Sequence, residues 1–156
     1  MSFVVTGLPV ETFRRLFGLP DDDLAARGVL RYVADAPLGF PCRVTLEDAR
    51  PGESLLLLNY EHQPAQTPYR ARHAIFVNES ARETARYVNE IPPCLTARPA
   101  IALRAYDEQG MMLDAALAPG PELEPLVRRL LAEPRTAYLH AHNAGRGCYA
   151  ARIDRC

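Results

Sequence analysis

Apolar and polar residues alternate along many short stretches of the chain, and this two-residue period predicts β-strands. Prolines and glycines, which favour turns, separate most of these stretches. Residues 54–60 are apolar on both faces, so this strand is expected in the middle of a sheet. Strands are predicted over residues 3–6, 29–33, 43–46, 54–60, 74–78, 101–106, 111–117, 136–143 and 148–154.

Apolar residues at helical spacing are fewer, and they are clearest between residues 121 and 134. There Leu123, Val127 and Leu130 share one face of a helix. Shorter helices are predicted over residues 9–17, 20–27 and 80–91. The last of these begins at a capping-box pattern and ends before two prolines. We therefore predict a single α+β domain over residues 1–156, with one twisted, mostly antiparallel β-sheet and two or three helices packed on it.

The last two predicted strands carry polar residues at even positions and apolar residues at odd positions. A loop over residues 143–147 keeps this division across the hairpin, because side chains alternate between the two faces of a strand. In this register His142 lies opposite Cys148. The polar face is formed by Tyr138, His140, His142, Cys148, Arg152 and Asp154.

Two imidazoles close to a thiol are compatible with three kinds of chemistry. His140, His142 and Cys148 are candidate ligands of zinc or another divalent metal, because such ions prefer nitrogen and sulfur donors. Cys148 is also a candidate catalytic nucleophile, with His142 as the base that activates its thiol. In the third interpretation, the group only satisfies its own hydrogen bonds on a polar sheet face. The sequence leaves all three interpretations open.

A metal site on this hairpin still lacks a fourth ligand. His62 stands at the start of a loop that contains prolines, so it is expected to be a solvated loop residue. The cysteines show no two-residue spacing typical of zinc or redox sites, and we expect them to be free thiols. The candidates for the fourth ligand are Cys42, His62, His73 and Asp154.

Arginines and tyrosines indicate a second candidate site, which would bind a small anionic ligand. Tyr69 and Arg70 lie in a predicted loop, and Arg104 and Arg152 lie on predicted strands. Guanidinium groups bind carboxylates and phosphates through paired hydrogen bonds. The alternative is that these arginines pair with acidic residues of the chain and order the loop. Self-association through the polar sheet face is a further expected use of these residues.

The composition excludes several functions. All 18 basic residues are arginines, so a pyridoxal Schiff base and a Walker A phosphate site, which need a lysine, are excluded. The formal net charge of −1 lacks the basic excess of a nucleic-acid-binding protein. No apolar run is long enough to span a bilayer and no secretory signal is found, so we expect no membrane partner and a cytoplasmic location.

Short motifs spread in order from about residue 29 to residue 155 carry a resemblance to a known family. They are Pro41-Cys42-Arg43, Asp48-Ala49-Arg50-Pro51-Gly52, Pro68-Tyr69-Arg70, Ile75-Phe76-Val77, Arg104-Ala105-Tyr106-Asp107 and His140-Ala141-His142-Asn143 followed by Gly147-Cys148. In these motifs the chain resembles the bacterial family known as domain of unknown function 1203. The resemblance implies a bacterial protein of similar length, and no activity, cofactor or catalytic residue comes with it.

These patterns favour a small-ligand-binding or partner-binding protein with a polar sheet face. The alternative is a metal-dependent or cysteine-based enzyme centred on the C-terminal His-x-His…Cys hairpin. The cofactor expected for that alternative is zinc or another divalent metal.

Overall fold

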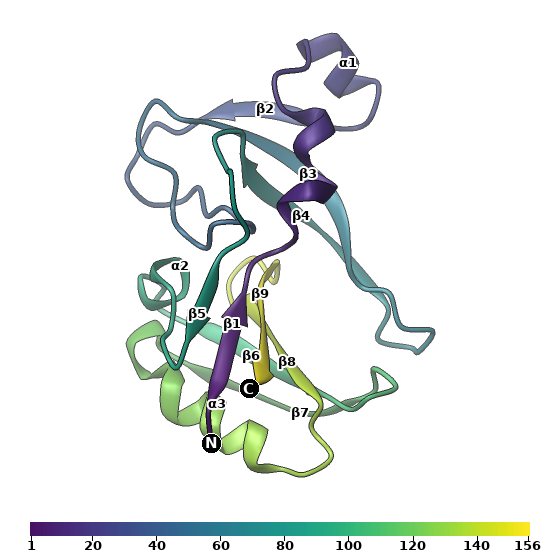
Figure 1. Cartoon of the computed structure of the whole chain (residues 1–156), viewed down its shortest axis with the longest axis vertical. Coiled ribbons are helices and arrows are strands. Elements are labelled where there is room, and N and C mark those ends of the chain that lie inside the picture. Colours follow the sequence, from purple (N-terminus) through teal and green to yellow (C-terminus); the bar gives the residue numbers. More distant parts are fainter.

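The computed structural model describes every residue of the chain, from 1 to 156 (Figure 1). Nine strands form two antiparallel sheets, and three short α-helices accompany them. The α+β class and the antiparallel pairing predicted from the sequence are confirmed, although the strands divide between two sheets instead of one. No helix could cross a membrane, since the longest has ten residues.

The strand orders of the two sheets define the architecture. The larger sheet has the order β5 (Arg86–Val88), β1 (Phe3–Thr6), β9 (Tyr149–Arg155), β8 (Tyr138–Asn143), β6 (Ile101–Tyr106) and β7 (Met112–Ala118). The smaller sheet has the order β2 (Leu30–Val33), β3 (Ser54–Gln63) and β4 (Ala71–Asn78). The helices are α1 (Asp21–Ala25), α2 (Pro93–Thr96) and α3 (Leu123–Ala132), with 3-10 turns at Val10–Thr12, Arg14–Leu16 and Gly120–Glu122.

Helix α3 packs on one face of the larger sheet, in the lower part of Figure 1. Its buried residues Leu123, Val127, Leu130 and Leu131 belong to the same hydrophobic core as the odd positions of β6, β8 and β9. These odd positions are Ile101, Leu103, Ala105, Leu139, Ala141, Ala151 and Ile153. Most of the apolar face predicted for the C-terminal hairpin is therefore the face that α3 covers.

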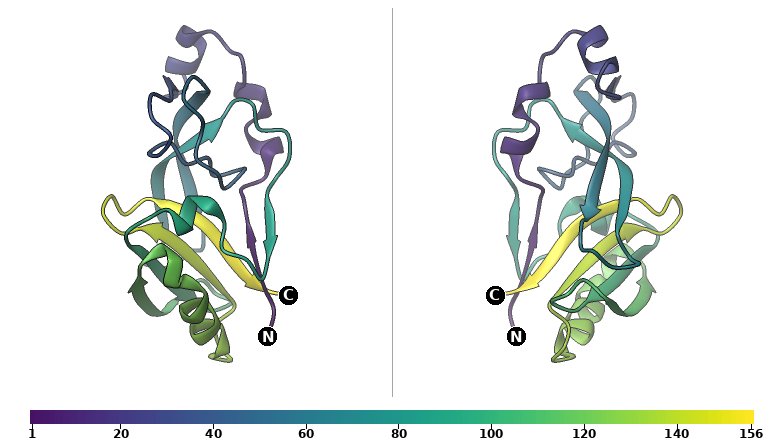
Figure 2. Two further views of the ribbon diagram at one scale, coloured as in Figure 1. Left: turned by 90° about the vertical axis from the view of Figure 1, so that its left-hand side faces the viewer. Right: turned by 90° about the vertical axis from the view of Figure 1, so that its right-hand side faces the viewer.

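The opposite face of the larger sheet meets the smaller sheet, which lies above it in Figures 1 and 2. Tyr149 of β9 packs with Leu58 of β3 and Ile75 of β4 in a second core. The β3–β4 hairpin also reaches the larger sheet, since Gln63 Nε2 donates a hydrogen bond to Tyr138 Oη at 2.8 Å. The polar, even-numbered face of β8 is therefore covered by protein.

A bulge changes the register that the sequence predicts for the C-terminal hairpin. His140 pairs with Arg152, but beyond the bulge His142 pairs with Tyr149. The prediction that His142 lies opposite Cys148 is therefore wrong. The extra residue also turns Tyr149 away from the α3 face, so this one odd position packs against the smaller sheet.

Two predicted elements are not formed. Residues 43–46 are not a strand but a tight turn, in which the Leu46 N–H donates to the Cys42 carbonyl at 3.0 Å and Leu46 has a φ of 56°. The helix predicted over residues 80–91 is replaced by a loop and β5, because this segment pairs with β1, as Val88 does with Val4. Pairing with a neighbouring strand overrides the local capping signal here.

Candidate metal centre

All four histidines of the chain meet between the two sheets. His62 comes from β3, His73 from β4, and both His140 and His142 come from β8. The ring centroid of His62 lies 5.7 Å from that of His140 and 5.1 Å from that of His142. The ring of His73 stacks on that of His62 at 4.8 Å. Residues far apart in the sequence thus form one cluster.

The alternation of side chains along the strands brings these rings together. Even positions of β3, such as Leu58, and odd positions of β4, such as Ile75, face the larger sheet. His62 and His73 continue these two rows and therefore point toward the even face of β8. The expectation that His62 is a solvated loop residue is wrong, because β3 extends to Gln63 and His62 is only 7 % exposed.

His62, His140 and His142 have the geometry of a metal-ligand set. All three are buried, and one nitrogen from each ring lies within 4.8 Å of the other two. Tetrahedral zinc, with Zn–N bonds of about 2.0–2.1 Å, holds its nitrogens about 3.4 Å apart. Inward movements of less than about 1 Å per ring would therefore close the set around an ion.

Each of the three rings carries a buried nitrogen without a hydrogen-bond partner. These atoms are Nδ1 of His62, Nδ1 of His140 and Nε2 of His142. Buried polar atoms are nearly always paired, because leaving one unpaired costs about 1–3 kcal/mol. Three such atoms in one cluster make these rings candidates for binding an ion.

Contacts on the far side of the rings fix the orientation of the cluster. His142 Nδ1 lies 2.9 Å from the Gly147 carbonyl oxygen. A carbonyl can only accept, so Nδ1 carries the proton and Nε2 keeps its lone pair. His62 Nε2 is hydrogen-bonded to His73 Nδ1 at 2.9 Å. Metal-binding histidines commonly use their second nitrogen in this way.

The environment keeps the rings uncharged at neutral pH. Burial, with smaller contributions from the neighbouring His73 and Arg104, lowers the pKa of His62 to about 4. Burial is also the main reason why the pKa of His140 falls to about 2 and that of His142 to about 3. Neutral imidazole is the form that binds metal ions. The protein therefore presents ligands that need no deprotonation at pH 7.

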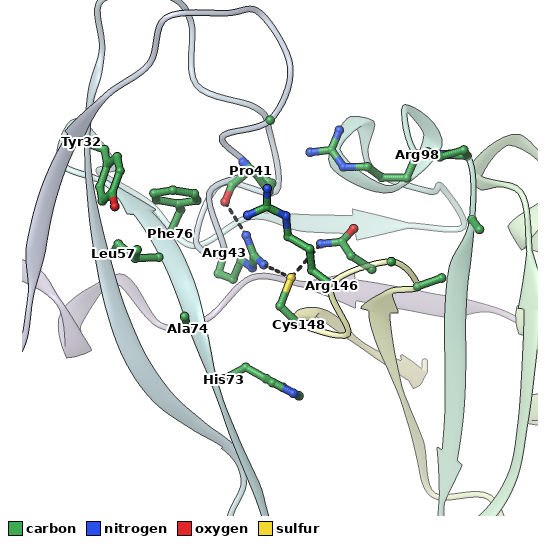
Figure 3. Close-up of a pocket in the computed structure, with 16 residues that line it drawn as sticks. Tyr32, Pro41, Arg43, Leu57, His73, Ala74, Phe76, Arg98, Arg146 and Cys148 are labelled. Atoms are coloured by element: carbon green, nitrogen blue, oxygen red, sulfur yellow. Dashed lines mark hydrogen bonds between the residues drawn. The ribbon is translucent and has the colours of Figure 1, made fainter.

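Cys148 lies outside the histidine cluster, in contrast to the set predicted from the sequence. Its sulfur accepts hydrogen bonds from Arg43 Nη2 at 3.2 Å and from Asn143 Nδ2 at 3.3 Å, as Figure 3 shows. The ligand set that the geometry supports replaces Cys148 with His62. His142 also makes no hydrogen bond to Cys148, because its Nδ1 bonds to the Gly147 carbonyl and its Nε2 has no partner.

The four predicted anion-binding residues lie in two places, the β3–β4 hairpin and the two strands beside β8. Arg70 Nε contacts Glu61 at 3.0 Å in the β3–β4 hairpin, next to the exposed Tyr69. Arg104 and Arg152 occupy the positions on β6 and β9 that flank His140.

Arg152 is bound by two neighbours. Its Nη2 contacts Asp154 at 2.8 Å, and its guanidinium lies 4.0 Å from the centre of the Tyr138 ring. The acidic pairing considered as the alternative for these arginines is present for Arg70 and Arg152.

The sequence carried a signal for His62 that the strand prediction did not use. The apolar even positions Leu56, Leu58 and Tyr60 lead directly to His62, so the two-residue period continues to residue 62. The importance of Arg43 had no such signal, because its partners Pro41, Tyr149 and Cys148 are set by the tertiary structure.

The segment that builds this centre coincides with a family match. Residues 39–155 match the family described as protein of unknown function, DUF1203. No curated protein and no solved structure matches the chain. The matched segment contains β3, β4 and β8, which carry all four histidines. Since the match covers well over half of the chain, the protein belongs to the DUF1203 family, as its sequence motifs predict.

Proposed function

We propose that this protein binds a divalent transition-metal ion, with zinc as the best fit, through His62, His140 and His142. The observation that carries the proposal is the three buried ring nitrogens that have no hydrogen-bond partner within the protein. Imidazole nitrogen is a preferred donor for zinc, copper, nickel and iron. Zinc fits best because it accepts a tetrahedral set without requiring further protein ligands of a special geometry.

A purely structural histidine cluster fits these observations less well. Aliphatic side chains would fill the same volume without unpaired polar atoms, as they do on the face that α3 covers. In the tautomer that His142 adopts, the free lone pair is on Nε2, the ring nitrogen that does not face the Gly147 carbonyl. A free lone pair on a buried nitrogen can bind a metal ion, but it does not contribute to the packing of the core.

The proposed centre has three protein ligands, which leaves a fourth position for water or a substrate atom. Catalytic zinc sites commonly have this arrangement, whereas structural sites are filled by four protein ligands. A bound ion would lower the pKa of a water molecule in that position and make it a nucleophile at neutral pH. His73 is half-exposed and hydrogen-bonded to His62, so the cluster approaches the protein surface on this side.

Metal binding is tested by measuring metal content and affinity in the whole, untagged protein. We expect about one equivalent of zinc by elemental mass spectrometry after purification without chelators. Stripped protein should take up Co²⁺ and show the visible absorption bands of a low-coordinate cobalt site. His62→Gln and His142→Gln should abolish this uptake, because each removes one donor and keeps a polar side chain of similar size. Cys148→Ser should keep the full metal content.

The same experiment contains outcomes that contradict the proposal. Folded, stripped wild-type protein that takes up none of Zn²⁺, Co²⁺, Ni²⁺ or Cu²⁺ would rule the site out. A loss of metal in Cys148→Ser as large as that in the histidine variants would show that the ion binds at Cys148, near the turn between β8 and β9. Far-ultraviolet circular dichroism and a thermal melt show that each variant is folded before its metal content is compared.

A further inference from the structure

A cavity lies beside the histidine cluster, on the other side of His73. It has a volume of about 640 Å³ and opens between the smaller sheet and the turn that connects β8 to β9 (Figure 3). This volume is in the range of pockets that bind small organic molecules. His73 is a wall of this pocket and also the hydrogen-bond partner of His62, so pocket and cluster adjoin.

The charge in this pocket has one sign. Arg43, Arg98 and Arg146 line it, and no aspartate or glutamate does. The charge of Arg98 is neutralised by Asp48, whose carboxylate lies 2.7 Å from Arg98 Nη2. Arg43 and Arg146 form no ion pair with any carboxylate of the protein. Two positive charges therefore remain without compensation.

Arg43 is the stronger of these signals because it is buried, with only 3 % of its surface exposed. Its Nε donates to the Tyr149 carbonyl at 2.8 Å and its Nη1 to the Pro41 carbonyl at 2.8 Å. Its Nη2 donates to the Cys148 sulfur at 3.2 Å. One N–H on each of the two Nη atoms is left over, since arginine has five donors. A buried charge is normally paired, because removing it from water is costly.

The wall opposite the arginines consists mainly of apolar and aromatic side chains. Phe76, Leu57 and Tyr32 form it, and the Tyr32 ring meets the Phe76 ring edge to face at a centroid distance of 5.6 Å. In Figure 3 these three side chains stand together on one side of the pocket, with Arg43 and Arg146 on the other. The pocket therefore offers one charged half and one aromatic half.

We infer that this pocket binds a small organic anion, with a carboxylate or phosphate head at Arg43 and Arg146 and a flat apolar body against Phe76. The two leftover N–H groups of Arg43 suit the two oxygens of such a head. Arg146 is exposed and has no partner of its own, so its guanidinium is free to close over the ligand. The site is built from residues other than the metal ligands, and ligand binding does not require an ion.

The test uses simple probes that carry one or both halves of this chemistry. Phenyl phosphate and benzoate have a head and a body, inorganic phosphate has only a head, and benzyl alcohol has only a body. Titrations of ¹⁵N-labelled, metal-stripped protein followed by nuclear magnetic resonance should show saturable shifts at residues 143–148 with phenyl phosphate or benzoate. The tighter of these two probes identifies the head group. Inorganic phosphate and benzyl alcohol should bind at least tenfold more weakly.

Variants separate this site from general attraction to a basic surface. Arg146→Gln should weaken phenyl phosphate about tenfold, because it removes one charge-assisted contact and disturbs no contact of the folded protein. Arg82→Gln is the matched control, since Arg82 is an exposed arginine whose side chain has no partner and does not line the pocket. It should leave the affinity unchanged. Phe76→Ala should weaken the binding of phenyl phosphate and leave the affinity for inorganic phosphate unchanged.

Three results would overturn the inference. Equal affinity for inorganic phosphate and phenyl phosphate would show that the apolar wall is not used. Equal affinity for benzyl alcohol and phenyl phosphate would show that the arginines are not used. Binding that appears only in zinc-loaded protein and resists Arg146→Gln would place the anion on the metal. Metal content is measured separately, so failure of this site and failure of the metal centre are distinguishable.

Discussion

The two faces of the larger sheet are made by the same strands, but they differ in the polarity of their buried side chains. On the face that α3 covers, Leu103, Leu139 and Ile153 are fully buried in an apolar core. On the opposite face, His140 and His142 are as deeply buried, yet ring nitrogens of both remain without partners. Burial alone therefore does not distinguish the two faces. Unsatisfied hydrogen-bonding capacity separates the face proposed to bind metal from the apolar one.

This difference follows from what each face has to achieve. Apolar side chains gain stability simply by leaving water, and many combinations of similar volume would do so. Buried neutral histidines contribute little in this way and carry the cost of desolvated, unpaired nitrogens. A protein that keeps three of them together would gain stability from an ion that pairs with these nitrogens. The following predictions test this contrast, from the largest expected effect to the smallest.

Acid should destabilise the metal-free protein through the histidine face. The pKa values of His62, His140 and His142 are lowered in the folded protein, and those in the unfolded chain are near 6.5. Between these values the unfolded chain binds more protons, so stability falls as the pH drops below 6.5. Each histidine contributes about 1.4 kcal/mol per pH unit in that window. Urea unfolding at pH 7, 6 and 5 measures this slope.

A variant identifies the source of the slope. His142→Gln should reduce it by about 1.4 kcal/mol per pH unit, because one titrating group is lost. A free energy of unfolding that stays constant from pH 7 to pH 5 would mean that the histidines are not held neutral by burial.

Leu103→Ala tests the apolar face. This side chain is fully buried beneath α3, so its truncation should cost about 2–5 kcal/mol of stability. Leu117→Ala on the neighbouring β7 is the control, because Leu117 is 68 % exposed and its truncation should cost little. Chemical denaturation at pH 7 gives both values, and equal costs for the two variants would contradict the assignment of the core. Metal uptake of the folded fraction should stay intact in Leu103→Ala.

Zinc should stabilise the wild-type protein by binding the folded state only. At a free concentration about 100-fold above the dissociation constant, the gain is about 2.7 kcal/mol. Cys148→Ser should show the same gain, and His62→Gln should show none. A rise in the melting temperature of His62→Gln that equals that of the wild type would exclude His62 as a ligand.

Arg70→Ala tests a polar residue that belongs to neither face. Its contact with Glu61 is an exposed ion pair, so we expect a loss of less than about 0.5 kcal/mol and no change in metal content. Differential scanning calorimetry at low and high salt measures this effect. A loss above about 1 kcal/mol would show that the β3–β4 hairpin depends on this pair.

Local sequence patterns predicted the elements whose structure depends on local spacing. The apolar stripe of Leu123, Val127 and Leu130 gave helix α3, and the alternation in the last two strands gave the face that this helix covers. Residues 80–91 had an equally good local signal for a helix, but the segment pairs with β1 instead. The strand β1 is far away in the sequence, and no local pattern reports such a pairing.

The candidate site could be predicted only in part, for the same reason. The pair His140 and His142 stood out because both lie on one strand, two residues apart. His62 belongs to the other sheet, so its approach to them depends on how the two sheets dock. The bulge that moved Cys148 away from His142 depends on one extra residue in β9, which hydrophobic alternation does not determine.

The origin of the histidines in two different sheets has a consequence for the folding reaction. His62 and His140 are distant in the sequence, so their rings approach only after both sheets have formed and docked. Contacts of this long range carry the largest loop-closure cost and are slow to form. An ion held between these rings would link the two sheets, and it would bind only late in folding, after the sheets have docked. It would slow unfolding far more than it would speed folding, and would lengthen the lifetime of the native state.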